Sequence, residues 1–105
     1  MQIQVNSDNS VAVNNELSRR VVADVNKALE RFNDRITRVE VHLSDVSGPK
    51  PGIQDKRCLM EARPAGLDPV AVSNQAATLE EAVRGAAQKL QRLLDSFFGR
   101  LGERA

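Results

Sequence analysis

Residues 29–43 read LERFNDRITRVEVHL, and the spacing of the apolar side chains changes within this stretch. As far as Phe32 the apolar positions recur every three or four residues, which is the period of one face of a helix. Beyond it Val39, Val41 and Leu43 alternate with polar residues, which is the period of a strand with one buried face. The stretch therefore predicts the end of an amphipathic helix followed directly by a strand.

The same two periods place the remaining elements. Asn14 and Asn15 are suited to cap the first helix, and Thr78-Leu79-Glu80-Glu81 is a capping box that predicts the start of a second helix. A loop rich in proline and glycine is expected over residues 45–55. The expected elements are a strand over 2–6, a helix over 17–32, strands over 36–44, 56–63 and 69–75, and the second helix, which Gly99 and Gly102 weaken near its end.

The order βαβββα predicts an α+β fold. Two amphipathic helices can bury their apolar faces on one side of a four-stranded sheet and leave the other side in contact with water. On that open side we expect polar residues, with Leu59 as a small apolar spot among them. A chain of 105 residues has the usual size of one domain, so we expect a single domain over residues 1–105 with a frayed tail at 103–105.

Composition limits the classes of function. Fifteen basic and fourteen acidic residues leave a net charge of +1, so nucleic-acid binding would depend on local clusters of cations. Trp and Tyr are absent, which argues against stacking of single-stranded bases on aromatic side chains. A single cysteine fits a reducing compartment, the N-terminus lacks a signal-peptide pattern, and no apolar run is long enough to span a membrane. We therefore expect a cytoplasmic protein that does not enter a membrane.

Groups suited to catalysis lack partners in the sequence. His42 is the one histidine, and no acid, nucleophile or metal ligand stands at a definable spacing from it. Cys58 alternates in phase with Met60 and Ala62, which predicts a buried thiol. The adjacent glutamates of the capping box suit the dipole of a first helical turn. We expect no enzyme activity, no cofactor, no metal and no small-molecule substrate.

Cations gather in one band on each helix. Lys89, Arg92 and Arg100 share a side of the second helix, away from its apolar face. Lys27 and Arg31 share a side of the first helix, where an aspartate weakens the positive field. Either band can be the solvated side of an amphipathic helix or a surface for phosphates.

Phe97 and Phe98 lie near the end of the second helix. By helical spacing Phe97 falls at the centre of the apolar face and Phe98 falls beside it. An exposed Phe98 would form a patch for a protein partner or a weak homo-oligomer. The alternative, which we favour, is that Phe98 covers the end of the first helix.

Five segments carry a resemblance to a known family. They are residues 1–3, 29–36, 39–43, 78–82 and 89–93. In this order the chain resembles the ribosome hibernation-promoting factor and ribosome-associated inhibitor family, also described as sigma-54 modulation proteins, in its short type. The longer type has a C-terminal dimerisation domain, and we expect this chain to act as the short type does.

The resemblance implies a fold similar to double-stranded RNA-binding domains. It also implies binding to the small ribosomal subunit, with its 16S ribosomal RNA, where tRNA and messenger would lie, and therefore inhibition of translation. Cations of both helices would contact RNA phosphates, and the matching positions are Lys27, Arg31, Lys89, Arg92 and Arg100. Residues 94–100 read LDSFFGR where the family often has lysines, so a second hypothesis is a protein-interaction module of the same fold with reduced RNA affinity.

Overall fold

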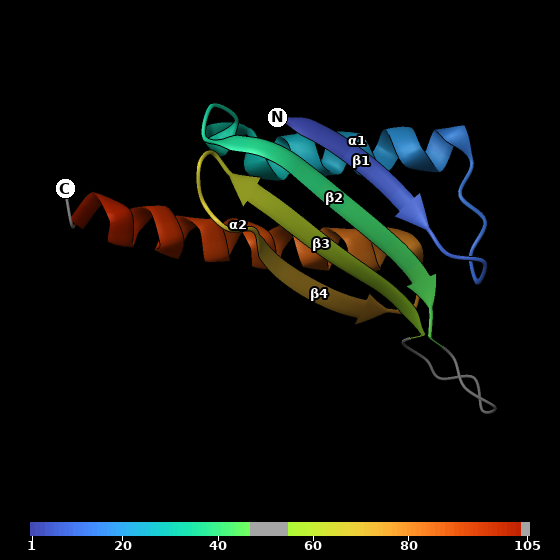
Figure 1. Cartoon of the computed structure of the whole chain (residues 1–105). Helices are drawn as coiled ribbons and strands as arrows, with labels where there is room; N and C mark the ends of the chain where they lie inside the picture. The colour runs from blue at the N-terminus through green and yellow to red at the C-terminus, as the bar shows by residue number, and fades with distance from the viewer. Residues whose placement is uncertain (47–54, 104–105) are drawn as a thin grey trace.

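Figure 1 shows one sheet with both helices packed on the same face, as the order of elements predicts. The computed structural model describes residues 1–46 and 55–103, so most of the loop expected over 45–55 lies outside the described residues, as do the last two residues of the expected tail. In chain order the elements are β1 (Gln2–Ser7), α1 (Asn15–Leu29), the 3-10 helix η1 (Glu30–Phe32), β2 (Ile36–Asp45), β3 (Lys56–Pro64), β4 (Val70–Ala76) and α2 (Leu79–Glu103). The predicted α+β fold is confirmed.

The strands lie in the order β1-β2-β3-β4. β1 pairs with β2 in parallel, whereas β2, β3 and β4 form an antiparallel meander. A parallel pair needs a crossover connection, and α1 provides it, which places that helix against the sheet. The register sets Ile3 beside Val39 and Val41 beside Met60. The inward-facing residues of neighbouring strands therefore meet the helices together.

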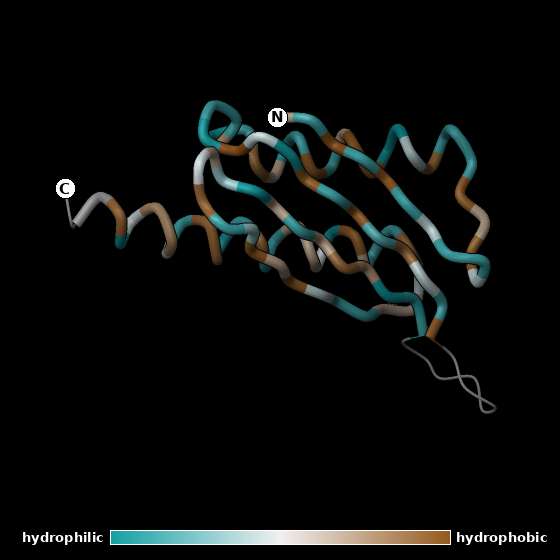
Figure 2. Tube along the Cα trace, in the orientation of Figure 1, coloured by the Kyte–Doolittle hydropathy of each residue, from teal (hydrophilic) through white to brown (hydrophobic). Residues whose placement is uncertain are grey.

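The core fills the space between the sheet and the helices. Figure 2 shows apolar and polar residues alternating along the strands. Val39, Met60, Leu90 and Leu94 are fully buried, and each such side chain contributes about 1.5–3 kcal/mol through removal from water. Cys58 is also fully buried, as predicted, and burial raises the pKa of its thiol to about 12.

Side-chain caps begin both helices. The backbone N–H of Leu17 donates to Oδ1 of Asn14 at 2.8 Å, so Asn14 is the cap of α1. Before α2 the backbone N–H of Glu81 donates to the hydroxyl of Thr78 at 3.1 Å, as the capping box predicts. The return contact differs from the motif, because the Glu81 carboxylate accepts from the Thr78 hydroxyl at 3.1 Å.

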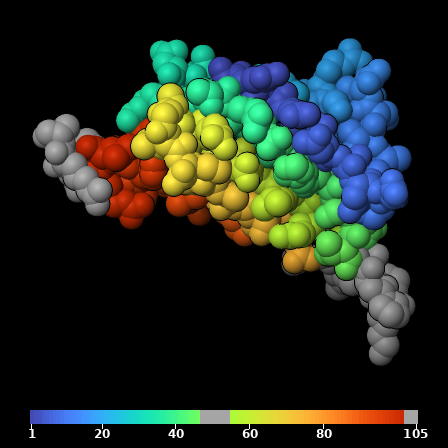
Figure 3. Space-filling model, in the orientation of Figure 1, coloured from blue at the N-terminus to red at the C-terminus, as the bar shows by residue number. Residues whose placement is uncertain are grey.

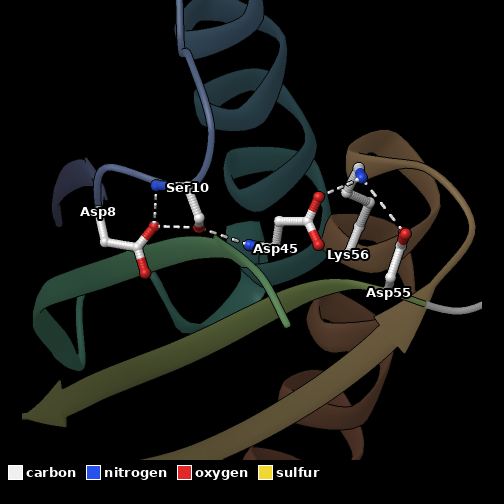
Figure 4. A network of polar contacts seen from close by, with 5 residues as sticks. All are labelled: Asp8, Ser10, Asp45, Asp55 and Lys56. Atoms are coloured by element: carbon white, nitrogen blue, oxygen red, sulfur yellow. Dashed lines mark hydrogen bonds and ion pairs between the residues drawn. The ribbon is translucent and has the colours of Figure 1, made fainter. Parts of the chain in front are cut away.

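A polar network ties the β1–α1 loop to the ends of β2 and β3 (Figure 4). The Ser10 hydroxyl donates to the Asp8 carboxylate and accepts from the backbone N–H of Asp45 at 2.8 Å. This hydrogen bond and one from the Ser10 backbone N–H hold the pKa of Asp8 below its ordinary value. Lys56 Nζ lies 2.8 Å from Asp45 and 3.2 Å from Asp55, and these hydrogen bonds raise the pKa of Lys56. The chain that leads into α1 is thus fastened to the meander.

Candidate nucleic-acid interface

A groove of about 450 Å³ runs between α1 and α2 on the side of the helices away from the sheet. Ala28 and Ala87 carry short side chains, so the groove forms where the two helices meet. The polar residues that line it are Asp24 and Lys27 of α1 and Arg84, Gln88 and Gln91 of α2. Five polar side chains from two rigid helices therefore converge on one concave surface.

Lys27 and Arg84 enter this groove from opposite helices. In residues 1–46 and 55–103 neither cation has a carboxylate within ion-pair distance, although Asp24 is part of the lining. Two solvated cations on facing helices make a local positive site in a nearly neutral chain. Lys27 was predicted from the sequence, whereas Arg84 was not. Its spacing of one turn from Gln88 marks the same side of α2, but that side is recognised only once α1 is placed beside it.

Ion pairs between the helices lie on either side of this positive site. Arg20 of α1 lies 2.9 Å from Glu16 and 3.8 Å from Glu80 of α2. Arg31 pairs with Asp95 of α2. All five side chains are 43–68% exposed, so each pair stabilises the fold by at most about 1 kcal/mol. The larger consequence is electrostatic, because each carboxylate occupies a guanidinium group that a phosphate could otherwise bind.

The three cations predicted on α2 are not among the residues that line the groove. Lys89 Nζ donates to the backbone carbonyl of Ser73 on the edge strand β4 at 3.0 Å. Lys89 and Arg84 are about 140° apart around the helix axis. Arg92 and Arg100 are exposed, and no ion pair of either is found in the described part of the chain. The predicted RNA contacts therefore divide between the groove and this outer side of α2.

Three phenylalanine rings meet at the C-terminal end of the groove. Phe98 is 8% exposed and packs on Phe32 of η1 with ring centroids 5.5 Å apart. Phe97 is half-buried and meets the Phe98 ring edge-on at 5.3 Å. The expectation that Phe97 holds the centre of the apolar face is wrong, because the last turns of α2 extend past the sheet (Figure 1) and η1 replaces the sheet as their packing partner. Phe98 covers the end of the first helix, so it forms no exposed patch.

Arg35, in the turn between η1 and β2, is a further cation at this end of the groove. Its Cζ lies 3.7 Å from the centroid of the Phe98 ring. Its carbonyl accepts from the backbone N–H of Ala65 at 2.9 Å, which fixes the turn against the β3–β4 connection. Arg31 lies over the other ring of the stack, with Cζ 5.1 Å from the Phe32 centroid. Arg35 falls within the family-like segment 29–36, but no spacing predicts its contact with Phe98, because that ring lies far along the chain.

Comparison with known proteins places this geometry in a family. A family model described as "Sigma 54 modulation protein / S30EA ribosomal protein" matches residues 3–101. The chain belongs to this family. None of the curated proteins matches its sequence.

Two solved structures have the same fold as this S30EA family chain. The N-terminal domain of Protein Y from Thermus thermophilus has a TM-score of 0.72 at 21% identity, covering 92% of this chain and 99% of that one. A ribosomal subunit interface protein from Coxiella burnetii has a TM-score of 0.70 at 17% identity, covering 94% of this chain and 99% of that one. The family resemblance read from the sequence is confirmed.

The open face of the sheet in this family member carries charges in rows (Figure 3 views this face). Arg38 of β2 stands opposite Arg63 of β3, and Glu40 stands opposite Glu61. Like charges directly opposite each other are unfavourable, and the offset comes along β2, where Arg38 lies 3.7 Å from Glu40. Positive and negative charges therefore alternate on this face.

The open face also carries the one histidine of the sequence and the small apolar spot predicted at Leu59. His42 and Leu59 stand opposite each other and are both half-buried, so the apolar spot is present but small.

Across the described residues no cluster of His, Cys, Asp and Glu is arranged to hold a metal ion. Neither helix has a stretch that is both long enough and apolar enough to cross a membrane within the part of the chain that was described.

Proposed function

We propose that this chain is a ribosome-binding stress factor that occupies the tRNA and messenger region of the small ribosomal subunit and inhibits translation. The observation that carries the proposal is the groove that Lys27 and Arg84 line from opposite helices, with no ion-pair partner among the described residues. Membership of the S30EA family supports it, as does the structural similarity to a ribosomal subunit interface protein from Coxiella burnetii. The ligand would be the phosphates of 16S ribosomal RNA.

The candidate phosphate contacts on the two helices are five exposed cations for which no ion pair is found within the described residues: Lys27, Arg84, Lys89, Arg92 and Arg100. If each neutralised one phosphate, the logarithm of the binding constant would fall with that of the salt concentration with a slope of about −3.5 to −4.5. Binding would be strong at low salt and largely lost at high salt. Aromatic base platforms are absent, so recognition would depend on RNA shape and backbone.

Inhibition then follows from occupancy. A rigid domain whose two helices lie on RNA phosphates excludes any other ligand from the same surface. No bond is made or broken, so the chain needs no catalytic group. Loss of inhibition should therefore follow loss of binding in every variant.

Co-sedimentation with purified 30S subunits and 70S ribosomes across a salt series tests the proposal. One variant combines Lys27→Gln with Arg84→Gln in the groove, and a second combines Lys89→Gln with Arg92→Gln on the outer side of α2. Each should reduce the salt slope by about 1.4–1.8, since two phosphate contacts are lost.

The matched control removes two cations from the open face of the sheet through Arg57→Gln with Arg63→Gln. Both residues are exposed, and the change in net charge equals that of the helix variants. The control should bind like the unchanged chain, and added tRNA should displace both. Absence of binding even at low salt, or equal loss in the control, would contradict the proposal.

The alternative is a protein-interaction module of the same fold. The net charge of +1 and the pairing of Arg20 and Arg31 with acids favour it, because both features weaken attraction to RNA. Its candidate contact is Phe97, since Phe98 is buried. Failure of ribosome binding at low salt is the result that would favour this alternative.

A further inference from the structure

We infer that Arg35 is an additional RNA-phosphate-binding residue and that Phe98 is the residue that positions it. The inference rests on the proposed function and adds a site at the C-terminal end of the groove, outside the cations that sequence spacing marks. The juxtaposition that carries it is a guanidinium group in the η1–β2 turn stacked on a buried ring of α2.

The stack fixes the plane of the Arg35 side chain. Its Cζ lies 3.7 Å from the Phe98 centroid, which is close enough for face-to-face contact between the guanidinium plane and the ring. Phe98 is itself held by Phe32 on one side and Phe97 on the other. The backbone of Arg35 is fixed through its carbonyl by Ala65. Both the backbone and the guanidinium group of Arg35 are therefore held in place before any ligand binds.

A guanidinium that stacks face to face on a ring keeps its N–H groups at its edge, outside the stack, where they can meet a ligand. Arg35 is exposed, and in the described part of the chain its side chain has no hydrogen bond and no ion pair. A planar fork of N–H donors binds two oxygens of one phosphate, which a lysine ammonium cannot match in geometry. Less side-chain entropy is lost on binding when the fork is already ordered.

Arg31 provides the contrast within the same cluster. It lies over Phe32, the other ring of the stack, but its guanidinium is paired with Asp95. A phosphate must displace that carboxylate to bind Arg31, whereas it can approach Arg35 without breaking an ion pair. At this end of the groove, Arg35 is therefore the cation that contributes more to binding.

The ligand is a polyanion rather than a single acidic side chain. Arg35 lies in the η1–β2 turn with its guanidinium over the Phe98 ring of α2, at one end of the groove, and Lys27 and Arg84 lie further along the groove. A chain of phosphates meets cations at both places at once, and each contact adds counterion release. An isolated carboxylate on a protein partner would use one of them.

The test measures affinity for 30S subunits and for a short RNA duplex across a salt series, using Arg35→Gln, Arg35→Lys, Phe98→Leu and Phe98→Tyr. Arg57→Gln on the open face of the sheet is the control for loss of one charge. Arg35→Gln should weaken binding about 10-fold and reduce the salt slope by about 0.7–0.9. Arg35→Lys should keep the slope but lose several-fold in affinity, because the charge remains and the stacked fork is lost.

The Phe98 variants separate positioning from folding. Phe98→Leu keeps an apolar group in the buried position and should lower affinity only when Arg35 is present, so that it adds nothing in the Arg35→Gln background. Phe98→Tyr keeps the ring and should restore binding. An effect of Phe98→Leu that persists without Arg35, or Arg35→Gln that binds like the Arg57→Gln control, would overturn the inference.

The two probes distinguish this inference from the proposed function. If the unchanged chain binds the duplex in an Arg35-dependent way but fails to bind 30S subunits, the inference stands and the proposed function falls. If it binds 30S subunits without dependence on Arg35, the proposed function stands and the inference falls. If it binds neither, both fall.

Discussion

Gly85 of α2 should resist replacement by alanine, although alanine is the better helix former. A Cβ added at Gly85 would lie 2.0 Å from Nδ2 and 2.6 Å from Cγ of Asn74 on β4, so that side chain must move. Asn74 Nδ2 donates to the carbonyls of Ala82 at 3.3 Å and Glu81 at 3.5 Å, which joins the edge strand to α2. Gly99 on the same helix is the matched control, because nothing lies within 4 Å of a Cβ added there.

The magnitudes decide the sign. Alanine in place of glycine inside a helix gains up to about 1 kcal/mol. Displacing Asn74 loses two long hydrogen bonds at about 0.5 kcal/mol each and adds about 1 kcal/mol for the forced repacking. Gly85→Ala should therefore lower the free energy of unfolding by about 1 kcal/mol, whereas Gly99→Ala should raise it by about 0.5 kcal/mol.

Urea unfolding followed by far-ultraviolet circular dichroism measures both values. In an Asn74→Ala background the obstacle is gone, so Gly85→Ala should become stabilising. Equal stabilisation by Gly85→Ala and Gly99→Ala in the unchanged background would refute the reasoning, as would a cost at Gly85 that survives the loss of Asn74.

Three further results are expected. Asp95→Asn should release Arg31, so that the salt slope of 30S binding becomes steeper by about 0.7–0.9 and the free energy of unfolding falls by at most about 1 kcal/mol. A steeper slope that persists when Arg31→Gln is added would speak against this release. Because burial raises the pKa of Cys58 to about 12, iodoacetamide should modify the thiol slowly in the folded protein and rapidly in urea. The free energy of unfolding should also fall as the pH rises from about 8.5, where the thiol of the unfolded chain ionises, toward the pKa of the thiol in the folded protein. Ser10→Ala should raise the pKa of Asp8 toward its ordinary value in an NMR titration. The lowered pKa stabilises the folded protein at pH values above the ordinary pKa of aspartate, and this contribution is lost as the pH falls through the lowered pKa. The variant should lack this contribution. An unchanged titration would show that Ser10 does not hold the carboxylate.

Periodicity was sufficient to predict the elements, because each strand and helix buries one face against the same core. The switch at residues 29–43 predicted the boundary between a helix and β2, and Asn14 and Thr78 predicted both helix starts. The parallel pairing of β1 with β2 has no local signal. It follows from the crossover through α1, which only the assembled sheet reveals.

The candidate site was less predictable, because it depends on which helix faces meet. Helical spacing grouped Lys89 with Arg92, yet the Lys89 ammonium lies on a carbonyl of β4. Arg84 became part of the groove only through the position of α1. Phe98 covers the end of the first helix as favoured, but Phe97 does not lie at the centre of the apolar face, because spacing along one helix does not reveal where that helix leaves the sheet.

The stacked phenylalanines also give the protein a built-in optical reporter. Trp and Tyr are absent, and the three Phe rings form one continuous cluster beneath Arg31 and Arg35. Near-ultraviolet absorption by the folded chain therefore arises mainly from that place, at the end of the proposed RNA-binding face. A change in the phenylalanine fine structure during a titration with inorganic polyphosphate, a polyanion that does not absorb at these wavelengths, would register events at this end without any label, whereas events on the open face of the sheet would leave it unchanged.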